Sequence, residues 1–231
     1  MKKTVKHKLI VLEGGDGAGK ATQASLLIKT LKRLGHTVTY FDFPRYDQSF
    51  FGHLTGRALR GDFGDFRHMS PYISSLPYML DRFTALPEIE IALNKGIVIC
   101  NRYTSSSMAF QATKLTGKPK KDIIQFVERA EYDELGLPRP NLVIYLHVPP
   151  TFSFEMIARK ASRNYLGKKN GTRDQHEKDR DFQEATVRTY LQLVRTKPDW
   201  KKIDCCERGG KLLSPEAIHE MVMVVVKECV L

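Results

Sequence analysis

A glycine-rich segment near the start of the chain constrains its fold more than any other feature. The apolar run Leu9–Leu12 and Glu13 lead directly into Gly14-Gly-Asp-Gly-Ala-Gly-Lys20, after which a helical pattern begins. Glycines permit backbone conformations in which successive N–H groups point at one anion, and the N-terminus of the next helix adds the positive end of its dipole. Lys20 adds a charge that can reach the outer phosphates of a nucleoside triphosphate. The segment therefore predicts a phosphate-binding loop between a strand and a helix.

The match to the phosphate-loop pattern is incomplete. The pattern is G-x-x-x-x-G-K followed by Ser or Thr, whose hydroxyl binds magnesium, whereas this chain has Ala21 and places Thr22 one position later. A tight strand-to-helix turn with an exposed lysine remains an alternative. A dinucleotide-binding turn fits less well, because that fingerprint requires a third glycine where Lys20 stands. The positions expected to bind ATP are Gly14, Gly15, Gly17, Ala18, Gly19, Lys20, Ala21 and Thr22.

Composition restricts the class of protein. The chain has 231 residues, of which 42% are hydrophobic, so we expect a single domain over residues 1–231 with a sizeable core. A formal net charge of +11 favours anionic partners. The sequence has no Cys-x-x-Cys spacing, no apolar stretch of membrane-spanning length and no signal-peptide core. We therefore expect a soluble, cytoplasmic protein with no membrane partner.

Strand and helix patterns alternate along the chain. Short β-rich runs occur at Leu9–Leu12, Thr37–Phe43, Ile97–Cys100, Leu142–Val148 and Trp200–Ile203. Helical patterns fall at Thr22–Leu34, Pro71–Lys95 (interrupted or kinked near Pro77 and Pro87), Ser105–Leu115, Lys121–Glu134 (with Gly117 and Pro119 before it), Pro150–Ala161, Glu177–Arg195 and Pro215–Val230. The alternation predicts an α/β fold, in which a parallel sheet is covered by helices on both faces and ligands bind at the carboxyl ends of the strands.

One segment departs from this pattern. Residues 158–180 carry eight lysines and arginines together with two glycines, and they are too polar to be core. A solvated loop is the simpler interpretation. Because a phosphate loop is expected elsewhere in the chain, we favour a mobile lid that lowers arginines onto transferring phosphates and excludes water.

Candidate catalytic side chains follow three of the expected strands. The first strand leads to the phosphate loop and Asp16, the second to Phe43-Pro-Arg45-Tyr46, and the third to Asn101-Arg-Tyr103. Arg45 and Arg102 can bind the phosphate of an acceptor nucleotide through forked hydrogen bonds. A surface salt bridge for Arg45, and a capping or ion-pairing role for Arg102, remain open. Phosphoryl transfer requires this kind of placement, with two substrates in line and cations around them.

Six motifs, in order and spacing, resemble the thymidylate kinase family, whose members phosphorylate dTMP with ATP. They are Glu13-Gly-Gly-Asp-Gly-Ala-Gly-Lys20, Phe43-Pro-Arg-Tyr46, Leu80-Asp-Arg82, Asn101-Arg-Tyr103, Gly136-Leu-Pro-Arg-Pro140 and His176-Glu-Lys-Asp179. The resemblance covers nearly the whole chain. It implies the fold of a P-loop nucleoside monophosphate kinase with a five-stranded parallel sheet, Mg²⁺ as cofactor, ATP and dTMP as substrates, and a homodimer by analogy.

The resemblance also implies roles for matching residues. Asp16 should lie near the sugar 3′-hydroxyl and magnesium, and Lys20 should contact ATP. Tyr78 should stack on thymine and Arg82 should donate to its O4, unless Tyr78 is a core residue and Arg82 pairs with Asp81. The positions expected to bind dTMP are Asp16, Phe43, Arg45, Tyr46, Tyr78, Arg82, Arg102, Ser107 and Glu177.

Catalytic arginines are expected in the lid. Family members with glycine in the phosphate loop, as at Gly17, use lid arginines at the transferring phosphate, and Arg163 and Arg173 are the candidates here. With Lys20, Asp16 and Arg102 they make up the expected catalytic set.

Two departures from the family pattern affect the metal site. Ala21 lacks the magnesium-binding hydroxyl, and Asn101 replaces the aspartate of an Asp-Arg-Tyr motif. We expect magnesium to be held mainly by substrate phosphates and Asp16, with Glu13 as a further candidate. These departures also leave open a catalytically weak nucleotide-binding module. A nucleic-acid-binding protein is disfavoured, because the basic residues concentrate in the expected lid.

Overall fold

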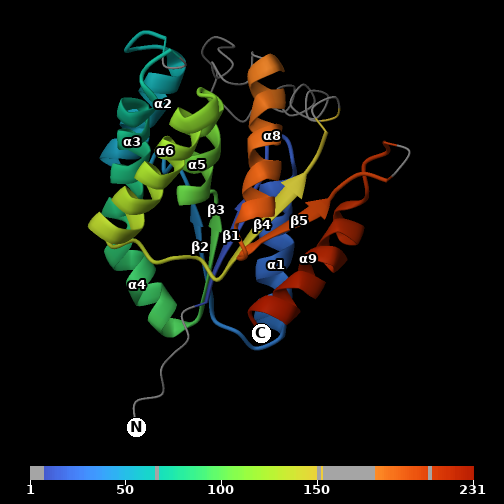
Figure 1. Ribbon diagram of the computed structural model, residues 1–231. Coiled ribbons are helices and arrows are strands. Elements are labelled where there is room, and N and C mark those ends of the chain that lie inside the picture. The colour runs from blue at the N-terminus through green and yellow to red at the C-terminus, as the bar shows by residue number, and fades with distance from the viewer. Residues whose placement is uncertain (1–7, 66–67, 150–151, 153–179, 208–209) are drawn as a thin grey trace.

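A five-stranded parallel sheet forms the centre of the molecule (Figure 1). The computed structural model describes residues 8–65, 68–149, 152, 180–207 and 210–231. The strand order is β2-β3-β1-β4-β5, and all four neighbouring pairs are parallel. The strands are β1 (Lys8–Glu13), β2 (Val38–Asp42), β3 (Ile97–Asn101), β4 (Leu142–His147) and β5 (Trp200–Asp204). All five expected strands and the parallel arrangement are confirmed.

Helices cover both faces of the sheet, as Figure 1 shows. On one face, α1 packs against α9. The other face carries α4, α5, α6 and α8, and α2 and α3 lie farther out. The helices are α1 (Lys20–Arg33), α2 (Phe50–Arg60), α3 (Pro71–Thr84), α4 (Leu86–Lys95), α5 (Thr104–Thr113), α6 (Gly117–Glu128), the π-helix η1 (Arg129–Glu134), α8 (Arg180–Thr196) and α9 (Pro215–Cys229).

The two faces of β1 supply two separate hydrophobic cores. Leu9 and Val11 belong to the core beneath α4 to α8, and Ile10 and Leu12 belong to the core beneath α1 and α9. All four side chains are fully buried, and burial of each stabilises the fold by about 1.5–3 kcal/mol. This period-2 alternation holds β1 rigidly in the middle of the sheet, so the loop that follows it has a fixed base.

Two helix predictions were wrong in part. The expected helix Pro71–Lys95 is interrupted at Ala85, near Pro87 as predicted, and so forms two helices, whereas Pro77 lies inside α3 without ending it. Gly117 and Pro119 do not separate helices but form the first turn of α6. Proline is tolerated there because the first N–H groups of a helix have no partner within the helix.

Helix α2 was missed. Ser49 caps it by accepting a hydrogen bond from Gly52 N at 2.8 Å, and Gly61 ends it with φ 91°. Gly52 and Gly56 lower the helix propensity of the segment, which hid the pattern. Gly52 is required, because a Cβ atom there would lie 2.1 Å from the carbonyl oxygen of Arg45.

Parts of the sequence prediction fall outside the described residues. The expected helix Pro150–Ala161 and the expected lid 158–180 are described only at Phe152 and Arg180, where α8 begins. Among the described residues, no helix is long and apolar enough to cross a membrane.

Candidate active site

The phosphate loop has its expected shape. Gly14, Gly17 and Gly19 all have positive φ, and a Cβ atom at Gly14 would lie 2.9 Å from the carbonyl oxygen of Leu146. The ammonium of Lys20 donates to the carbonyl oxygens of Gly14 at 3.0 Å and Gly15 at 2.9 Å. Lys20 is only 8% exposed, so the alternative of a turn with an exposed lysine is wrong.

The residues that follow the loop open α1. Ala18 N donates to the carbonyl oxygen of Gly15 at 3.2 Å, which closes the turn before the helix. Ala21 and Thr22 are both exposed in the first turn of α1. The dipole of this helix therefore points at the loop.

Arg102, at the end of β3, contacts Asp16 of the phosphate loop, which follows the neighbouring strand β1. Its Nη2 forms an ion pair with Asp16 Oδ1, and its guanidinium lies 5.2 Å from the ring centre of Phe110. Burial lowers the pKa of Arg102, but the Asp16 carboxylate, together with Tyr190, Glu13 and Tyr46, raises it, and the net effect is a rise. Arg102 has φ 64°, a strained conformation for a residue other than glycine. The structure thus brings together two residues that the sequence placed at separate strand ends.

Arg45 lies in a buried network with α3. Asp81 accepts from Arg45 N at 2.8 Å and from Nε at 3.1 Å, and Nη2 donates to Thr84 Oγ1 at 2.7 Å. Arg45 is 9% exposed, so its salt bridge is not a surface one. Asp81 forms its ion pair with Arg45, and the alternative of an Arg82–Asp81 pair is therefore wrong.

Arg82 is held instead by Glu131 of the π-helix η1. Its Nε and Nη2 donate to the two carboxylate oxygens of Glu131 at 2.6 Å each, and Nη2 also donates to Ser107 Oγ at 2.6 Å. Burial lowers the pKa of Arg82, while the charge of Glu131 and its hydrogen bonds raise it, with a net rise. Single-turn π-helices often occur at functional sites, and here the π-helix carries the carboxylate that orients Arg82.

Three aromatic residues of the expected dTMP site have different environments. Tyr78 is half-buried and packs against a small cluster formed by Ala58 and Leu59 of α2. Tyr46 is 42% exposed. Phe43 precedes a cis peptide bond to Pro44 and is 2% exposed, with its ring packed between Phe41 and Tyr103. The structure therefore places Phe43 in the core beneath the loop. Glu177, Arg163 and Arg173 lie outside the described residues.

Glu13, a candidate magnesium ligand in the sequence, is surrounded by hydroxyl groups instead. Glu13 is fully buried, and its oxygens accept hydrogen bonds from Ser105 at 2.6 Å, Ser106 at 2.8 Å and Tyr190 at 2.8 Å. It therefore ties β1 to α5 and α8. In the sequence, the run of four hydroxyl residues Thr104–Ser107 was the signal that could have indicated buried carboxylates nearby. Thr104 likewise donates to a buried carboxylate, that of Glu131.

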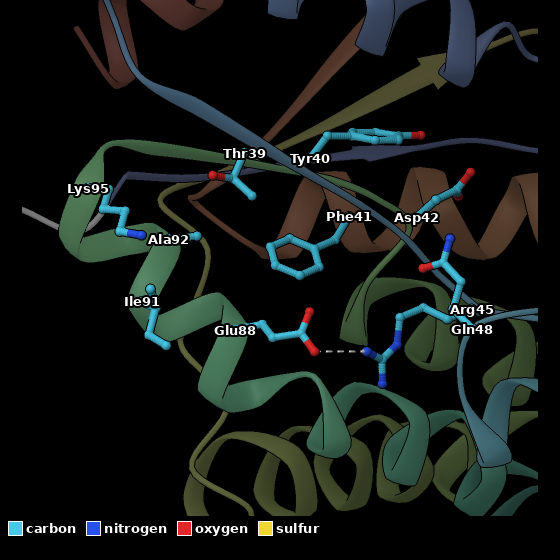
Figure 2. A pocket seen from close by; sticks show the side chains of 10 residues that line it. All are labelled: Thr39, Tyr40, Phe41, Asp42, Arg45, Gln48, Glu88, Ile91, Ala92 and Lys95. Carbon is cyan, nitrogen blue, oxygen red and sulfur yellow. Dashed lines mark ion pairs between the residues drawn. The ribbon is translucent and has the colours of Figure 1, made fainter.

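A hollow of about 420 Å³ lies on the outer side of the edge strand β2 (Figure 2). Arg45 and Glu88 face each other across it at 3.9 Å. Its lining residues come from β2, the following loop and α4, and none belongs to the phosphate loop. It is therefore separate from the site formed by Lys20, Asp16 and Arg102.

The oxygen donors near the loop fit magnesium only in a hydrated, phosphate-bound form. Among the described residues there is no cluster of three or more His, Cys, Asp or Glu side chains that could hold a metal ion. Asp16 and Asn101 offer oxygen atoms at the strand ends, and Asn101 Oδ1 is buried without a hydrogen-bond partner in this part of the chain. Magnesium prefers such ligands and keeps several of its waters.

A parallel sheet with a phosphate loop after β1, and with arginines at neighbouring strand ends, defines a P-loop nucleoside monophosphate kinase. The comparisons identify the family. The family model "Thymidylate kinase" matches residues 12–210, and the chain therefore belongs to the thymidylate kinase family.

Named relatives agree. The chain is 32% identical over 187 residues to the thymidylate kinase of Mycobacterium tuberculosis, covering 80% of this chain and 85% of that protein. It is 27% identical over 226 residues to the human thymidylate kinase, covering 96% and 91%. A solved structure of the Candida albicans thymidylate kinase has the same fold, with a TM-score of 0.70, 21% identity, and coverage of 96% and 91%.

Proposed function

We propose that this protein is a thymidylate kinase that transfers the γ-phosphate of ATP directly to dTMP, yielding ADP and dTDP. The ion pair between Asp16 and Arg102 is the observation that carries the proposal. It places Asp16 of the phosphate loop in contact with an arginine from the neighbouring strand, so that the donor-phosphate site and the acceptor-binding arginine adjoin each other. Direct transfer requires this arrangement.

The two phosphate groups are bound by different cations in this proposal. Lys20 and the loop amides bind the donor phosphates of ATP. Arg102 and Arg45 bind the phosphate of dTMP, Arg45 being pre-oriented by Asp81. Binding costs less when the guanidinium is already ordered.

Base recognition is assigned to Arg82 and Tyr78. The bonds to Glu131 and Ser107 engage Nε and Nη2 of Arg82, and its Nη1 makes no hydrogen bond with any described residue. A donor fixed in this way can select a carbonyl such as O4 of thymine. The half-buried Tyr78 supplies a ring that can stack on the base, and the exposed Tyr46 is assigned to the sugar side.

The metal and the lid complete the proposal. Magnesium bound with ATP would neutralise charge on the phosphates, and Asp16 is its proposed protein partner. Arg163 and Arg173 are proposed to act at the transferring phosphate, and Glu177 near the acceptor sugar. A catalytically weak binding module is not favoured, because the relatives that match most of the chain are named kinases.

A homodimer in the cytoplasm is part of the same proposal. Several large apolar side chains of α3 are exposed, which supports an interface on this helix: Tyr72, Ile73, Leu76 and Phe83. Light scattering of the purified protein at several concentrations tests the dimer, and a single-chain mass at all concentrations would contradict it.

The test of the function is a panel of acceptors. ADP release is measured with ATP and magnesium and with dTMP, dUMP, UMP, dCMP or AMP, in the parent and in Lys20→Met. We expect the highest kcat/KM with dTMP and a loss of about 100-fold or more in kcat in the variant. A preference for AMP or dCMP would reject the proposal.

A further inference from the structure

The ends of β2 and β3 hold a polar pair that no role above uses. Asp42 and Asn101 are register partners in the parallel ladder, and Asn101 Nδ2 donates to Asp42 Oδ1 at 2.8 Å. Ile97 and Ile99, which alternate with Asn101 on β3, belong to the core beneath α1. The pair therefore points to the face of the sheet where α1 begins. Figure 2 agrees, since Tyr40 and Asp42 lie on one side of β2 and Phe41 lies on the other, toward α4.

Asn101 carries an acceptor with no donor. The residue is 8% exposed, and its Oδ1 has no hydrogen-bond partner among the described residues. An unsatisfied buried acceptor destabilises the folded state, so such groups are usually paired with a water or ligand. The available acceptor and the neighbouring carboxylate both suit a ligand that donates hydrogen bonds and carries positive charge.

The strand register places this pair next to the phosphate loop. Leu12 of β1, Asn101 of β3 and Asp42 of β2 are successive partners across the sheet, and Arg102, which follows Asn101, forms an ion pair with Asp16 of the loop. Burial raises the pKa of Asp42, although part of the residue is exposed at the strand edge. Hydrogen bonds from Asn101 and Tyr40 and the charges of Arg102 and Lys20 oppose the rise. The charges of Arg102 and Lys20, which are assigned to the acceptor and donor phosphates, therefore act on the Asp42 carboxylate. A carboxylate beside these cations repels bare phosphate but attracts phosphate-bound magnesium.

We propose that Asp42 and Asn101 act as one acceptor pair for the waters of the magnesium–ATP complex at the phosphate loop, with Asp42 supplying the charge and Asn101 the second oxygen. Asp42 is thus a positioning residue for the metal. This inference rests on the proposed use of magnesium–ATP by this site. At the ends of β2 and β3, Asp42 carries the negative charge, and residue 101 is a neutral amide.

The close contact makes the position of the charge testable. In Asn101→Asp two carboxylates would face each other at hydrogen-bond distance, so one would be forced to take up a proton or to move. In Asp42→Asn the pair would carry no charge. In the double variant the charge returns on the other strand, and the same hydrogen bond forms in the reverse direction. Asp42→Asn alone should therefore lose metal binding, and the double variant should recover it.

The experiment uses the full chain and Mn²⁺ as a probe of the metal site. Electron paramagnetic resonance measures the binding of Mn²⁺ to the protein–ATP complex in the parent, Asp42→Asn, Asn101→Asp and the double variant, with the exposed Asp47→Asn as the control. Urea unfolding verifies that each variant folds. We expect about tenfold weaker Mn²⁺ binding in Asp42→Asn, no weakening in Asn101→Asp, recovery to within about twofold in the double variant, and parental binding in the control.

Two results would overturn the inference: Mn²⁺ affinity unchanged in folded Asp42→Asn, or no recovery in the folded double variant. The required magnesium concentration should follow the same order in rate assays. A parent that binds Mn²⁺–ATP but never phosphorylates dTMP would reject the proposed function and leave the pair assignment intact.

Discussion

Both carboxylate oxygens of Glu131 bind the guanidinium of Arg82, one at Nε and one at Nη2, inside a fully buried site. The two residues are 49 positions apart in the chain, and the π-helix η1 brings them together. The ion pair thus joins α3, which carries the proposed base-recognising residues, to the segment that precedes β4.

Removal of the charge of Glu131 should damage both stability and substrate recognition. In Glu131→Gln the Arg82 cation stays buried without a counter-charge, so we expect a loss of about 3–5 kcal/mol in the free energy of unfolding. KM for dTMP should rise more than KM for ATP. Urea denaturation and steady-state kinetics measure the two effects.

The control for this variant is Glu134→Gln on the same π-helix. Glu134 pairs with Arg129 at 3.1 Å, but both side chains are largely exposed. An exposed pair of this kind contributes at most about 1 kcal/mol. Equal losses in the two variants would contradict the assigned role of Glu131.

Tyr190→Phe should loosen the connection between β1 and α8. Its hydroxyl donates to Glu13 at 2.8 Å, and the carboxylate would stay buried with one donor fewer. We expect a loss of about 1–3 kcal/mol in unfolding free energy. Tyr145→Phe is the matched control, because that ring stacks on Tyr190 but its hydroxyl contacts His147 only at 3.4 Å. A smaller change for Tyr190 than for Tyr145 would be evidence against this connection.

Gly52→Ala and Gly56→Ala should differ sharply although both lie inside α2. A Cβ atom at Gly52 meets the backbone of Arg45 at 2.1 Å, whereas one at Gly56 meets the movable ring of Tyr46 at 3.2 Å. We expect Gly52→Ala to lower stability by about 2 kcal/mol or more and to weaken dTMP binding, because Arg45 must shift. Gly56→Ala should be close to neutral, as the gain of about 1 kcal/mol in helix propensity offsets the contact. Thermal unfolding and dTMP titration measure both, and a neutral Gly52→Ala would exclude the tight contact.

Lys114 should make stability depend on alkaline pH. Burial lowers the pKa of Lys114 to about 8, and its ammonium donates to Ser74 at 2.8 Å. Between pH 8 and the ordinary pKa of 10.5, the folded state binds fewer protons at this residue than the unfolded state does. The contribution of Lys114 to stability therefore rises with pH through this window.

Replacement of Lys114 by methionine tests this dependence. The variant should lose the rise between pH 8 and 10 in urea unfolding, whereas the exposed Lys121→Met should keep it. An identical pH slope in parent and Lys114→Met would show that this lysine does not titrate as stated.

The sequence was sufficient for the features that depend on local pattern. The strands of the sheet follow from short β-rich runs, and the phosphate loop follows from glycine spacing and Lys20, because backbone conformation and helix start are set by neighbouring residues. The meeting of Asp16 and Arg102 followed from the rule that ligands bind where parallel strands end.

The partners of the buried arginines could not be derived in this way. Arg45 contacts Asp81, 36 positions away, and Arg82 contacts Glu131 through a π-helix that no local pattern indicated. Helix α2 could not be predicted because its glycines give it a low helix propensity, and it forms through tertiary contacts such as that of Gly52 with the backbone of Arg45. These features depend on packing between distant segments, which periodicity does not report.

The most direct measurement of the central claim is transfer of label from γ-³²P-ATP to dTMP, followed by separation of the products. We expect labelled dTDP to appear in step with ADP in the parent, and to fall steeply in Arg102→Lys, where the forked contact is lost. Label released as free phosphate, or no labelled dTDP from a folded parent that binds both nucleotides, would contradict direct transfer at this site.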